Sequence, residues 1–500
     1  MLDATTPDWV KHAIFYQIFP DRFARSVHLE KPNNLEPWDS DPTPFGYKGG
    51  DLYGVIEHLD YLQDLGITAL YFNPIFQSAS NHRYHTHDYY RVDPLLGGDE
   101  AFDDLLNECR RRGIRIVLDG VFNHASRGFF QFNDALENGA SSPWVDWFSF
   151  RGFPANAYDL SRPPGYTAWY GLHALPKFNT DNPQVREFLM RVGEHWIRRG
   201  IDGWRLDVPE EIKSAGFWQE FRERIKGLNP DAYIVAEIWH PVPEALRGDQ
   251  FDAVMNYPFA EAAIAFTAGR RVVPAMTEGR GYRPYPPLTG TDYGKRIDQL
   301  LGMYPWSIQL AQLNLLGSHD TARLATVVGD DVASVRLALL LLLTFPGAPS
   351  IYYGDEIGLA GGPSDALARR SFPWNEPSKW NTDLLHFTKD VIALRRSHSA
   401  LRTGAYHWLS AGATTYAFAR THGESPDNGP ETLVVALNVG EVPQTLTIPL
   451  LGLPVRRSQP DLLLGASATV AAYSSSEIAV QLPARSAAVL DCSLLIEKST

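Results

Sequence analysis

The chain has 500 residues, a formal net charge of −13 and a charged fraction of 21%. This acidic balance argues against nucleic acid or an anionic membrane as the main partner, because either would need a clustered excess of Lys and Arg. The two cysteines, Cys109 and Cys492, lie far apart, so neither a disulfide framework nor a thiolate metal site is indicated.

The beginning of the chain, MLDATTPDWVKHAIFY, lacks the basic and apolar regions of a signal peptide. No segment approaches the roughly 18 uninterrupted apolar residues that a membrane helix needs. The strongest apolar run begins at Leu337 and breaks at Pro346. We therefore expect a cytoplasmic protein without a membrane partner.

The first part of the chain alternates strand-like and helical runs. The apolar runs AIFYQIF, ITALYFNPIF and RIVLDGVFNH are separated by two stretches with helical spacing, around HLDYLQDLG and AFDDLLNECRRRG. This βαβαβ rhythm predicts a parallel sheet with right-handed crossovers.

The rhythm stops between residues 125 and 180. This segment is rich in Gly, Pro, Ser, Phe and Trp and shows no clear helical periodicity. It is too long for an ordinary connection between a strand and a helix. We expect a small inserted domain over 125–180, after the third strand.

Alternation then resumes and completes a barrel. The helical runs PQVREFLMRVGEHWIRRG and GFWQEFRERIKGLNP are interleaved with the strand-like runs GWRLD, YIVAE, DAVMNY, LNLLG and PSIYYGDE. The pattern predicts a (β/α)8 TIM barrel built from residues 1–124 and 181–398. Its strands are expected to begin near Ile14, Ala69, Ile114, Gly203, Tyr233, Ala253, Leu313 and Ser350.

The last part of the chain has another texture. The runs TTYAFARTH, ETLVVALNV, QTLTIPL and SAAVLDCSL alternate apolar and polar residues between turn-rich breaks. This alternation is typical of antiparallel strands with one buried face. We expect a C-terminal antiparallel β-sandwich over 399–500.

Three acidic residues stand where buried strands should end. Asp207 closes GWRLD, Glu237 closes YIVAE and Asp320 follows LNLLGSH. In parallel barrels the chemistry gathers at the carboxyl ends of the strands. Any one of these acids could instead cap a helix or lie in a solvated loop, but the threefold repetition favours a shared site.

Neighbours two residues away are predicted to give two of these acids different roles. Arg205 should share a face of its strand with Asp207, lower the pKa of that carboxyl and hold it ionised, which suits a nucleophile. The indole of Trp239 should restrict the hydration of Glu237 and favour its protonated form, which suits a general acid. A structural salt bridge and a simple packing contact are the alternatives.

A divided pair of carboxyls is what retaining glycoside hydrolysis needs. One carboxylate attacks the anomeric carbon, while the other protonates the leaving oxygen and then activates water. Asp320 and His319 could grip sugar hydroxyls beside the reacting centre. His124, after the third strand, could reach the same sugar.

Four segments resemble the conserved segments of the α-amylase family of glycoside hydrolases, in the same order. They are DGVFNH at Asp119, GWRLDV at Gly203, AEIWH at Ala236 and GSHD at Gly317. FYQIFPDRFA, SNHRYHTHDY and LPKFN are most similar to the branch of neopullulanases, cyclomaltodextrinases and maltogenic amylases. The resemblance spans nearly the whole chain.

The resemblance implies a role for each site residue. Asp207 would be the nucleophile, Glu237 the general acid and base, and Asp320 the stabiliser of the transition state. Tyr84 would stack under the sugar at subsite −1. The full set implied to bind substrate is Tyr84, Asp119, His124, Arg205, Trp239, His319, Asp365 and Arg369. For Asp365 and Arg369, a surface ion pair on a loop is the alternative.

The activity implied is that of a retaining α-glycoside hydrolase. Its substrates would be α-1,4 bonds of malto-oligosaccharides, cyclodextrins, pullulan or starch fragments, with α-1,6 bonds left open as a second linkage. A 4-α-glucanotransferase that uses the same covalent intermediate is the alternative. A non-catalytic relative that binds carbohydrate or acts as a scaffold is a third reading, although this chain keeps all the catalytic carboxylates.

Several positions depart from the branch. An acid of the branch is replaced by His85, so we expect chains to continue past subsite −1. Pro209 and Glu210 replace Ala and Asn on the acceptor side, so the preference between linkages cannot be carried over. Branch members usually carry an N-terminal domain before the barrel, which we do not expect here, and the oligomeric state stays open.

No metal or other cofactor is expected. Asp51 and Asn123 match family calcium ligands, but the loop ARSVHLEKPNN after the first strand lacks the closely spaced oxygen ligands that calcium needs. The histidines His82, His85 and His87 have a spacing that could bind zinc. Their place in a substrate loop of the family argues against that use.

Overall fold

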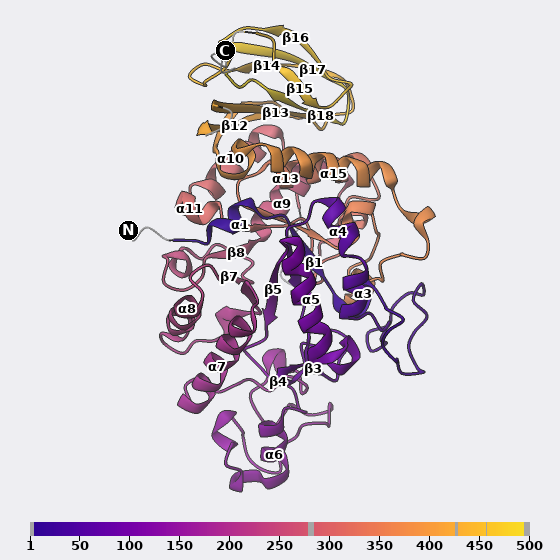
Figure 1. Cartoon of the computed structure of the whole chain (residues 1–500), viewed down its shortest axis with the longest axis vertical. Helices are drawn as coiled ribbons and strands as arrows, with labels where there is room; N and C mark the ends of the chain where they lie inside the picture. The colour runs from indigo at the N-terminus through magenta and orange to yellow at the C-terminus, as the bar shows by residue number, and fades with distance from the viewer. Residues whose placement is uncertain (1–4, 279–284, 426–428, 457, 495–500) are drawn as a thin grey trace.

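The computed structural model describes residues 5–278, 285–425, 429–456 and 458–494. Figure 1 shows three parts along the longest axis of the molecule. A barrel lies in the middle, the segment that contains α6 (Phe130–Asn138) lies at one end, and the C-terminal sheets lie at the other.

The barrel is closed by eight parallel strands, with β1 paired to both β2 and β10. The strands are β1 Phe15–Ile18, β2 Ala69–Phe72, β5 Arg115–Gly120, β6 Gly203–Leu206, β7 Tyr233–Ala236, β8 Ala253–Asn256, β9 Leu313–Asn314 and β10 Ala348–Tyr352. Apart from Arg115, every residue in them is buried, as expected for parallel strands covered on both faces. The eight predicted strands are confirmed, each within two residues of its expected start.

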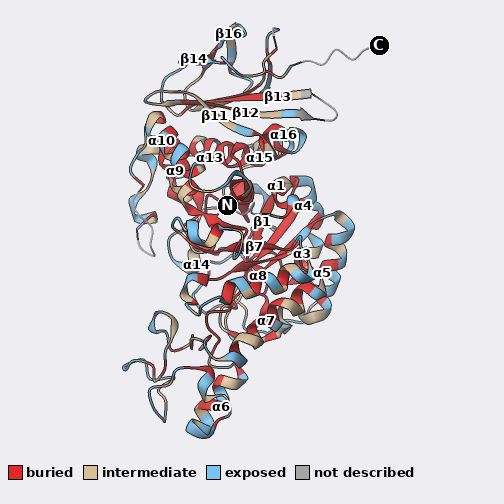
Figure 2. Cartoon of the chain, turned by 90° about the vertical axis from the view of Figure 1, so that its left-hand side faces the viewer, coloured by how far each residue is buried: buried red, intermediate tan, exposed pale blue. Residues whose placement is uncertain are grey.

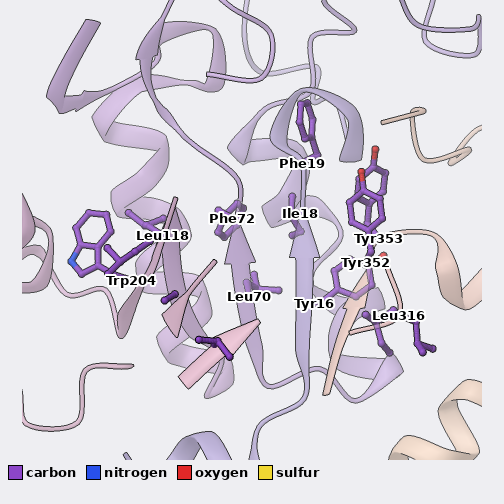
Figure 3. Close-up of a cluster of buried hydrophobic side chains, with 14 of the residues drawn as sticks. Tyr16, Ile18, Phe19, Leu70, Phe72, Leu118, Trp204, Leu316, Tyr352 and Tyr353 are labelled. Atoms are coloured by element: carbon purple, nitrogen blue, oxygen red, sulfur yellow. The ribbon is translucent and has the colours of Figure 1, made fainter. Parts of the chain in front are cut away.

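Alternate side chains of the strands fill two different spaces. Phe15, Tyr71, Val117, Tyr233 and Met255 belong to one buried cluster, which occupies the barrel interior. Their neighbours along the strands point outward under the helices. Figure 3 shows Ile18, Leu70, Phe72 and Leu118 of this outer cluster on the adjacent strands β1, β2 and β5.

Helices surround the barrel, and the four predicted around HLDYLQDLG, AFDDLLNECRRRG, PQVREFLMRVGEHWIRRG and GFWQEFRERIKGLNP are confirmed. The longer ones are α3 Leu52–Glu57, α4 Leu59–Leu65, α5 Gly98–Arg112, α7 Pro183–Arg199, α8 Phe217–Leu228, α9 Tyr257–Thr267, α10 Gly290–Leu301, α13 Val332–Thr344 and α15 Thr382–Ser397. The short ones are α1 Asp8–His12, α2 Pro20–Phe23, α11 Trp306–Gln309, α12 Leu324–Val327, α14 Asp365–Ala368 and α16 Ser399–Thr403. Within the described residues, no helix is long and apolar enough to span a membrane.

Local signals explain the helix ends and the apolar run at Leu337. The side chain of Asn182 accepts a hydrogen bond from Gln184 N before α7, and Gly200 ends that helix with a φ of 112°. The run at Leu337 forms α13, which is buried on almost all sides between the barrel and the C-terminal sheets (Figure 2). A helix that is apolar all round needs such a doubly covered place.

Two structures in the loops were missed from the sequence. The segment after β2 forms an antiparallel hairpin, β3 Phe76–Ser78 with β4 Thr86–Val92. The segment between β5 and α7, in which the sequence shows no clear helical periodicity, contains α6. This helix has 9 residues and buries only Phe132 and Ala135, which is too little for a visible helical period. We keep 125–180 as a proposed inserted domain.

The C-terminal part is an antiparallel β-sandwich, as predicted. One sheet has the order β11-β12-β13-β18-β15 and the other β14-β17-β16. The strands are β11 Ala405–Ala411, β12 Thr415–Ser425, β13 Gly429–Asn438, β14 Gln444–Pro449, β15 Asp461–Leu464, β16 Thr469–Tyr473, β17 Glu477–Leu482 and β18 Ser486–Asp491. Inward side chains such as Val434, Ile448 and Val480 form one apolar cluster between the two sheets.

Candidate active site

The three strand-end acids meet in one cavity of about 600 Å³. Asp207 directly follows β6, Glu237 directly follows β7, and Asp320 lies in the loop after β9. Asp207 and Glu237 are only 7% and 6% exposed, so neither is a solvated loop acid. The lining residues are His82, Tyr84, His85, His124, Trp169, Tyr170, Leu172, Leu175, Asp207, Val208, Glu210, Glu211, Glu237, Trp239, His240, Asp320, Asp365 and Arg369.

The buried guanidinium of Arg205 joins three carboxylates. Its Nη1 donates to both oxygens of Asp119, at 2.8 and 2.9 Å, and to Oδ1 of Asp207 at 3.1 Å. Its Nη2 lies 3.1 Å from Oε2 of Glu237. The register explains this convergence, because Asp119 pairs with Arg205 across β5 and β6, and Glu237 follows the next strand. Arg205 therefore pairs with Asp119 and Glu237 as well as with Asp207, whereas the sequence had indicated only the pair with Asp207.

Burial dominates the charge state of the nucleophile candidate. It raises the pKa of Asp207 well above the ordinary value, and the nearby Glu237 carboxylate raises it further, while Arg205 lowers it. The prediction that Arg205 would leave Asp207 with a lowered pKa is therefore wrong. One guanidinium shared among three carboxylates does not offset the loss of water and the like charge.

Glu237 also differs from its prediction. Burial raises the pKa of Glu237, and the Arg205 guanidinium opposes that rise. Trp239, expected to favour the protonated form, instead donates its indole N–H to Oε1 of Glu237 at 3.2 Å, which lowers this pKa. Asp207 and Glu237 thus share one guanidinium at a buried site, where retention of one proton between the two carboxyls is favoured.

The backbone beside the nucleophile candidate is strained. Val208 has a φ of 36°, which a β-branched residue rarely adopts. In this conformation its N–H donates to Oε2 of Glu237 at 3.1 Å. The strained turn thus ties the end of β6 to the acid at the end of β7.

Asp119 lies behind the cavity wall. It is 1% exposed and accepts hydrogen bonds from the hydroxyls of Tyr71 at 3.0 Å and Tyr84 at 2.7 Å, besides Arg205. Tyr84 lines the cavity. Neither Asp119 nor Arg205 is among the lining residues; both support lining side chains, and their binding of sugar stays a prediction.

His319 is also a supporting residue in this structure. The side-chain amides of Gln17 and Asn73 donate to its Nδ1 at 3.0 and 3.1 Å. The hydrogen is therefore on Nε2, which faces the Tyr84 hydroxyl at 2.7 Å and Oδ2 of Asp320 at 3.1 Å. The ring of His319 is 0% exposed and does not line the cavity, so its contact with the sugar stays a prediction.

Arg369 holds Asp320 from the other side. Its Nη2 donates to Oδ1 of Asp320 at 3.1 Å and its Nε donates to the carbonyl of His319 at 2.9 Å. Asp365, at the start of α14, lies 3.7 Å from Nη2. Both residues line the cavity, and Arg369 is buried, so the pair is more than a surface ion pair.

Three uncharged imidazoles complete the wall near Tyr84. Burial lowers the pKa of His124 to about 3 and that of His85 to about 4, and it lowers the pKa of His82 as well. His124 stacks on Trp169, with ring centroids 5.4 Å apart. These rings offer hydrogen bonds without charge, which suits hydroxyl groups.

The carboxylate considered as a calcium ligand is already bonded within the protein. The carboxylate of Asp51 accepts from Lys31 Nζ at 2.8 Å, from Gly54 N at 2.7 Å and from Ser26 N and Oγ at 3.1 Å. The Lys31 ammonium group thus lies against the carboxylate of Asp51, where a bound calcium ion would have to lie. Across the described part of the chain, no group of three His, Cys, Asp or Glu side chains could hold a metal ion.

Several lining residues were not predicted. Trp169, Tyr170, Leu172 and Leu175 come from the segment between β5 and α7. Trp169, Tyr170 and Leu172 cluster just before the motif LPKFN, which begins at Leu175, and this clustering was the available signal for a wall of the cavity. On another wall, Oε2 of Glu210 lies 3.0 Å from Nε2 of His240, which links the loops after β6 and β7.

Comparison with known proteins gives concordant matches. A family model described as alpha amylase, catalytic domain, matches residues 17–380. A cyclomaltodextrinase of Geobacillus thermopakistaniensis (strain MAS1) is 44% identical over 448 residues, covering 89% of this chain and 71% of that protein.

Solved structures match over nearly the whole chain. The crystal structure of the debranching enzyme from Nostoc punctiforme has a TM-score of 0.89 and 53% identity, covering 98% of this chain and all of that one. The cyclic α-maltosyl-(1→6)-maltose hydrolase from Arthrobacter globiformis has a TM-score of 0.84 and 38% identity, covering 97% and 100%.

Proposed function

The chain belongs to the α-amylase family of glycosidases, and on that premise we propose that it hydrolyses α-glucosidic bonds by double displacement, with retention of configuration. The observation that carries this proposal is the placement of Asp207 and Glu237, each 3.1 Å from the same guanidinium, in one cavity with Asp320. A non-catalytic relative would have no need for three carboxyl groups held at such a cost in desolvation.

In the first step, Asp207 attacks the anomeric carbon and the glycosidic bond breaks. Glu237 donates its proton to the departing oxygen, so the leaving chain is released as an alcohol and a glycosyl ester forms on Asp207. In the second step, Glu237 takes a proton from water, which attacks the same carbon and frees Asp207. Burial raises the pKa of both carboxyls, so the pair retains a proton, and we propose that this proton lies on Glu237 when the sugar is bound.

The residues around Asp207 and Glu237 would stabilise the charges that form on the carboxyls and on the sugar ring during these steps. Arg205 compensates whichever of Asp207 and Glu237 is ionised, because it contacts both. Asp320, held by Arg369 and by His319, would bind sugar hydroxyls and stabilise positive charge on the flattened ring. Tyr84 would offer its ring to the sugar between these groups.

The proposed substrates are malto-oligosaccharides, cyclodextrins, pullulan or starch fragments, with both α-1,4 and α-1,6 bonds cleaved. The similar protein named cyclomaltodextrinase supports a cyclodextrin substrate. The similar structures of a debranching enzyme and of a hydrolase of a (1→6)-linked cyclic sugar support α-1,6 cleavage. Because His85 lines the cavity as an uncharged ring, we expect chains to extend past subsite −1.

Glucanotransfer is a second activity that one contact favours. Glu210 and His240 both line the cavity and are joined across two loops, three residues beyond Asp207 and Glu237 respectively. Their polar groups could orient the hydroxyl of an incoming sugar in the place of water. Transfer products that accumulate at high maltotriose concentration would support this activity.

The function is tested by incubating the enzyme with maltohexaose, β-cyclodextrin and pullulan and following the products by chromatography and NMR. We expect new reducing ends whose first-formed anomer is α. Initial release of the β-anomer would contradict double displacement. Release of single glucose units alone from the non-reducing end would contradict the role given to His85.

A further inference from the structure

Two separate loops meet at the carboxylate of Asp320. Asp320 lies in the loop after β9, whereas Arg369 directly follows α14, in the segment after β10. The hydrogen bond from Arg369 Nη2 to Oδ1 of Asp320, at 3.1 Å, therefore spans two loops. Its geometry depends on how each loop is held against the barrel, and the end of β10 holds both.

Arg323 fastens the loop after β9 to the end of β10. It follows Asp320 by three residues, and its side chain is completely buried. Its guanidinium carbon lies 4.0 Å from the ring centre of Tyr352 and 4.3 Å from that of Tyr353. Its Nη1 donates to the main-chain carbonyl of Tyr353 and lies 3.5 Å from Oδ1 of Asp355. Two ring faces and a carboxylate thus stabilise the charge at this place.

The hydroxyls of the same two tyrosines fasten the segment after β10. Tyr352 Oη donates to the carbonyl of Ala368 at 3.2 Å, and Tyr353 Oη donates to that of Arg370 at 2.6 Å. Figure 3 shows both rings at the end of β10, and their centroids are 4.7 Å apart. The backbone on either side of Arg369 is therefore held by the rings that cover the guanidinium of the other loop.

The stability of the fold alone does not explain a guanidinium at this place. Arg323, Tyr352 and Tyr353 are each at most 1% exposed, and none of them lines the cavity. Among the described residues, Nε and Nη2 of Arg323 have no hydrogen-bond partner, which adds to the cost of burying them. Replacement of a buried ion pair by apolar side chains is often neutral or stabilising. A role in holding two loops in register gives this buried charge a use.

We propose that Arg323, Tyr352 and Tyr353, hereafter the β10 clamp, are positioning residues that set the place of the Asp320 carboxylate for the transition state. This assignment rests on the proposed function, in which Asp320 stabilises positive charge on the sugar ring. A displacement of about 1 Å is enough to weaken such a group strongly. The β10 clamp touches no sugar and acts through the contact between Arg369 and Asp320.

The first test removes only two hydroxyl groups. The double variant Tyr352→Phe and Tyr353→Phe keeps both rings over Arg323 and releases the carbonyls on either side of Arg369. It should lower kcat on maltohexaose roughly tenfold and leave KM within about twofold, because Asp320 acts on the transition state.

Tyr233→Phe is the matched control. Tyr233 is buried in the barrel interior as the first residue of β7, at the opposite end of that strand from Glu237. Its hydroxyl donates to the carbonyl of Ala311 at 2.7 Å. This variant loses a hydrogen bond of the same kind and should keep the wild-type kcat on maltohexaose.

A second background separates positioning from general stability. With the reactive substrate α-maltotriosyl fluoride, the double variant should lose roughly tenfold in rate beside a wild-type Asp320. Within Asp320→Asn the same two changes should cost less than about twofold, because the group that they position no longer carries charge. Arg323→Met should follow the same pattern, and the double variant keeps the proposal testable if Arg323→Met does not fold.

Three results would overturn the proposal. They are an unchanged kcat in the double variant, equal losses with Asp320 and within Asp320→Asn, and a loss of the same size in Tyr233→Phe. A wild-type rate in Asp320→Asn would instead remove Asp320 from the proposed function.

Discussion

Buried arginines in two regions of this molecule have opposite surroundings. Behind the wall of the active-site cavity, Arg205 contacts the carboxylates of Asp119, Asp207 and Glu237. Where the barrel meets the sandwich, the described contacts of Arg395 and Arg420 are with main-chain carbonyls, including those of Thr344, Leu401 and Gly404. All three guanidiniums are completely buried.

The pKa directions of these arginines follow their partners. Burial lowers the pKa of Arg395 well below its ordinary value and that of Arg420 to about 9. Burial also opposes charge on Arg205, but the Asp119 and Glu237 carboxylates outweigh it and raise its pKa. The carbonyls at the junction satisfy donors without adding charge, although Arg420 and Arg402 lower the pKa of Arg395 further, whereas the cavity gathers carboxylates that repel one another. We interpret the junction between barrel and sandwich as built for stability and the active-site cavity as built for reactivity.

The largest expected effect is on catalysis. Asp207→Ala or Glu237→Gln should lower kcat on maltohexaose by roughly 10⁴-fold, because each removes a group that forms or breaks bonds. The melting temperature should stay the same or rise, because one of the crowded carboxyl groups is gone. Near-normal turnover in either variant would refute the assigned roles.

The next effect is on stability at the other region. Arg420→Met should leave the carbonyls of Thr344 and Gly404 without their donor, while Leu401 keeps Arg395, and should lower the free energy of unfolding by about 3 kcal/mol or more. Arg402→Met, on the adjacent helix α16, is the matched control and should cost much less, since Arg402 is only half-buried. Equal melting temperatures of the two variants would remove the contrast between the regions.

A smaller effect concerns the pH dependence of stability. The folded-state pKa of Asp207 is raised, so the stability that its protonated form contributes is present at low pH and is lost as the pH rises through that pKa. Asp207→Asn imitates the protonated form at every pH. The variant should therefore gain melting temperature over the wild type at about pH 8, with less gain at about pH 5.

Asp39→Asn, at an exposed position, is the control for that titration. It should gain much less melting temperature than Asp207→Asn at about pH 8, because the residue is exposed. A gain for Asp207→Asn that is larger at low pH would have the wrong sign and would contradict the raised pKa.

The smallest expected effect is on the ratio of transfer to hydrolysis, through the Glu210–His240 pair that lines the cavity. Glu210→Asn removes the contact with His240. The side chains of Glu210 and His240 are 43% and 60% exposed, so the ratio of transfer to hydrolysis should change by about fivefold at most. Glu244→Gln, an exposed residue in the same loop as His240 that does not line the cavity, should leave the ratio unchanged. Product ratios from maltotriose measure both, and identical ratios in the two variants would remove Glu210 from the acceptor side.

The barrel was predictable because each of its strands is a short apolar run that ends at a turn or a polar residue. β7, for instance, is YIVA with an acid directly after it. The hairpin β3–β4 and helix α6 were not predictable in the same way, since Phe76 of β3 packs on Trp196 of α7 and Phe132 of α6 packs on Phe148, partners that lie outside these elements in the sequence. Tertiary contacts decide such short elements more than local periodicity does.

The site was predictable as a set of positions but not as a set of contacts. Alternation along β6 correctly placed Arg205 beside Asp207. It could not show that Asp119 and Glu237 share the same guanidinium, because that depends on the register between three strands. The hydrogen bond from Trp239 and the burial of His319 likewise depend on orientations that a linear pattern does not contain.

The central claim is that Asp207 forms a covalent glycosyl intermediate that Glu237 then helps to hydrolyse. The most direct measurement uses Glu237→Gln with α-maltotriosyl fluoride, because fluoride leaves without an acid whereas release of the intermediate needs the base. Mass spectrometry of the digested protein should find one maltotriosyl group on the peptide that contains Asp207. Attachment at any other residue, or turnover of the fluoride to the β-anomer without attachment, would contradict this account.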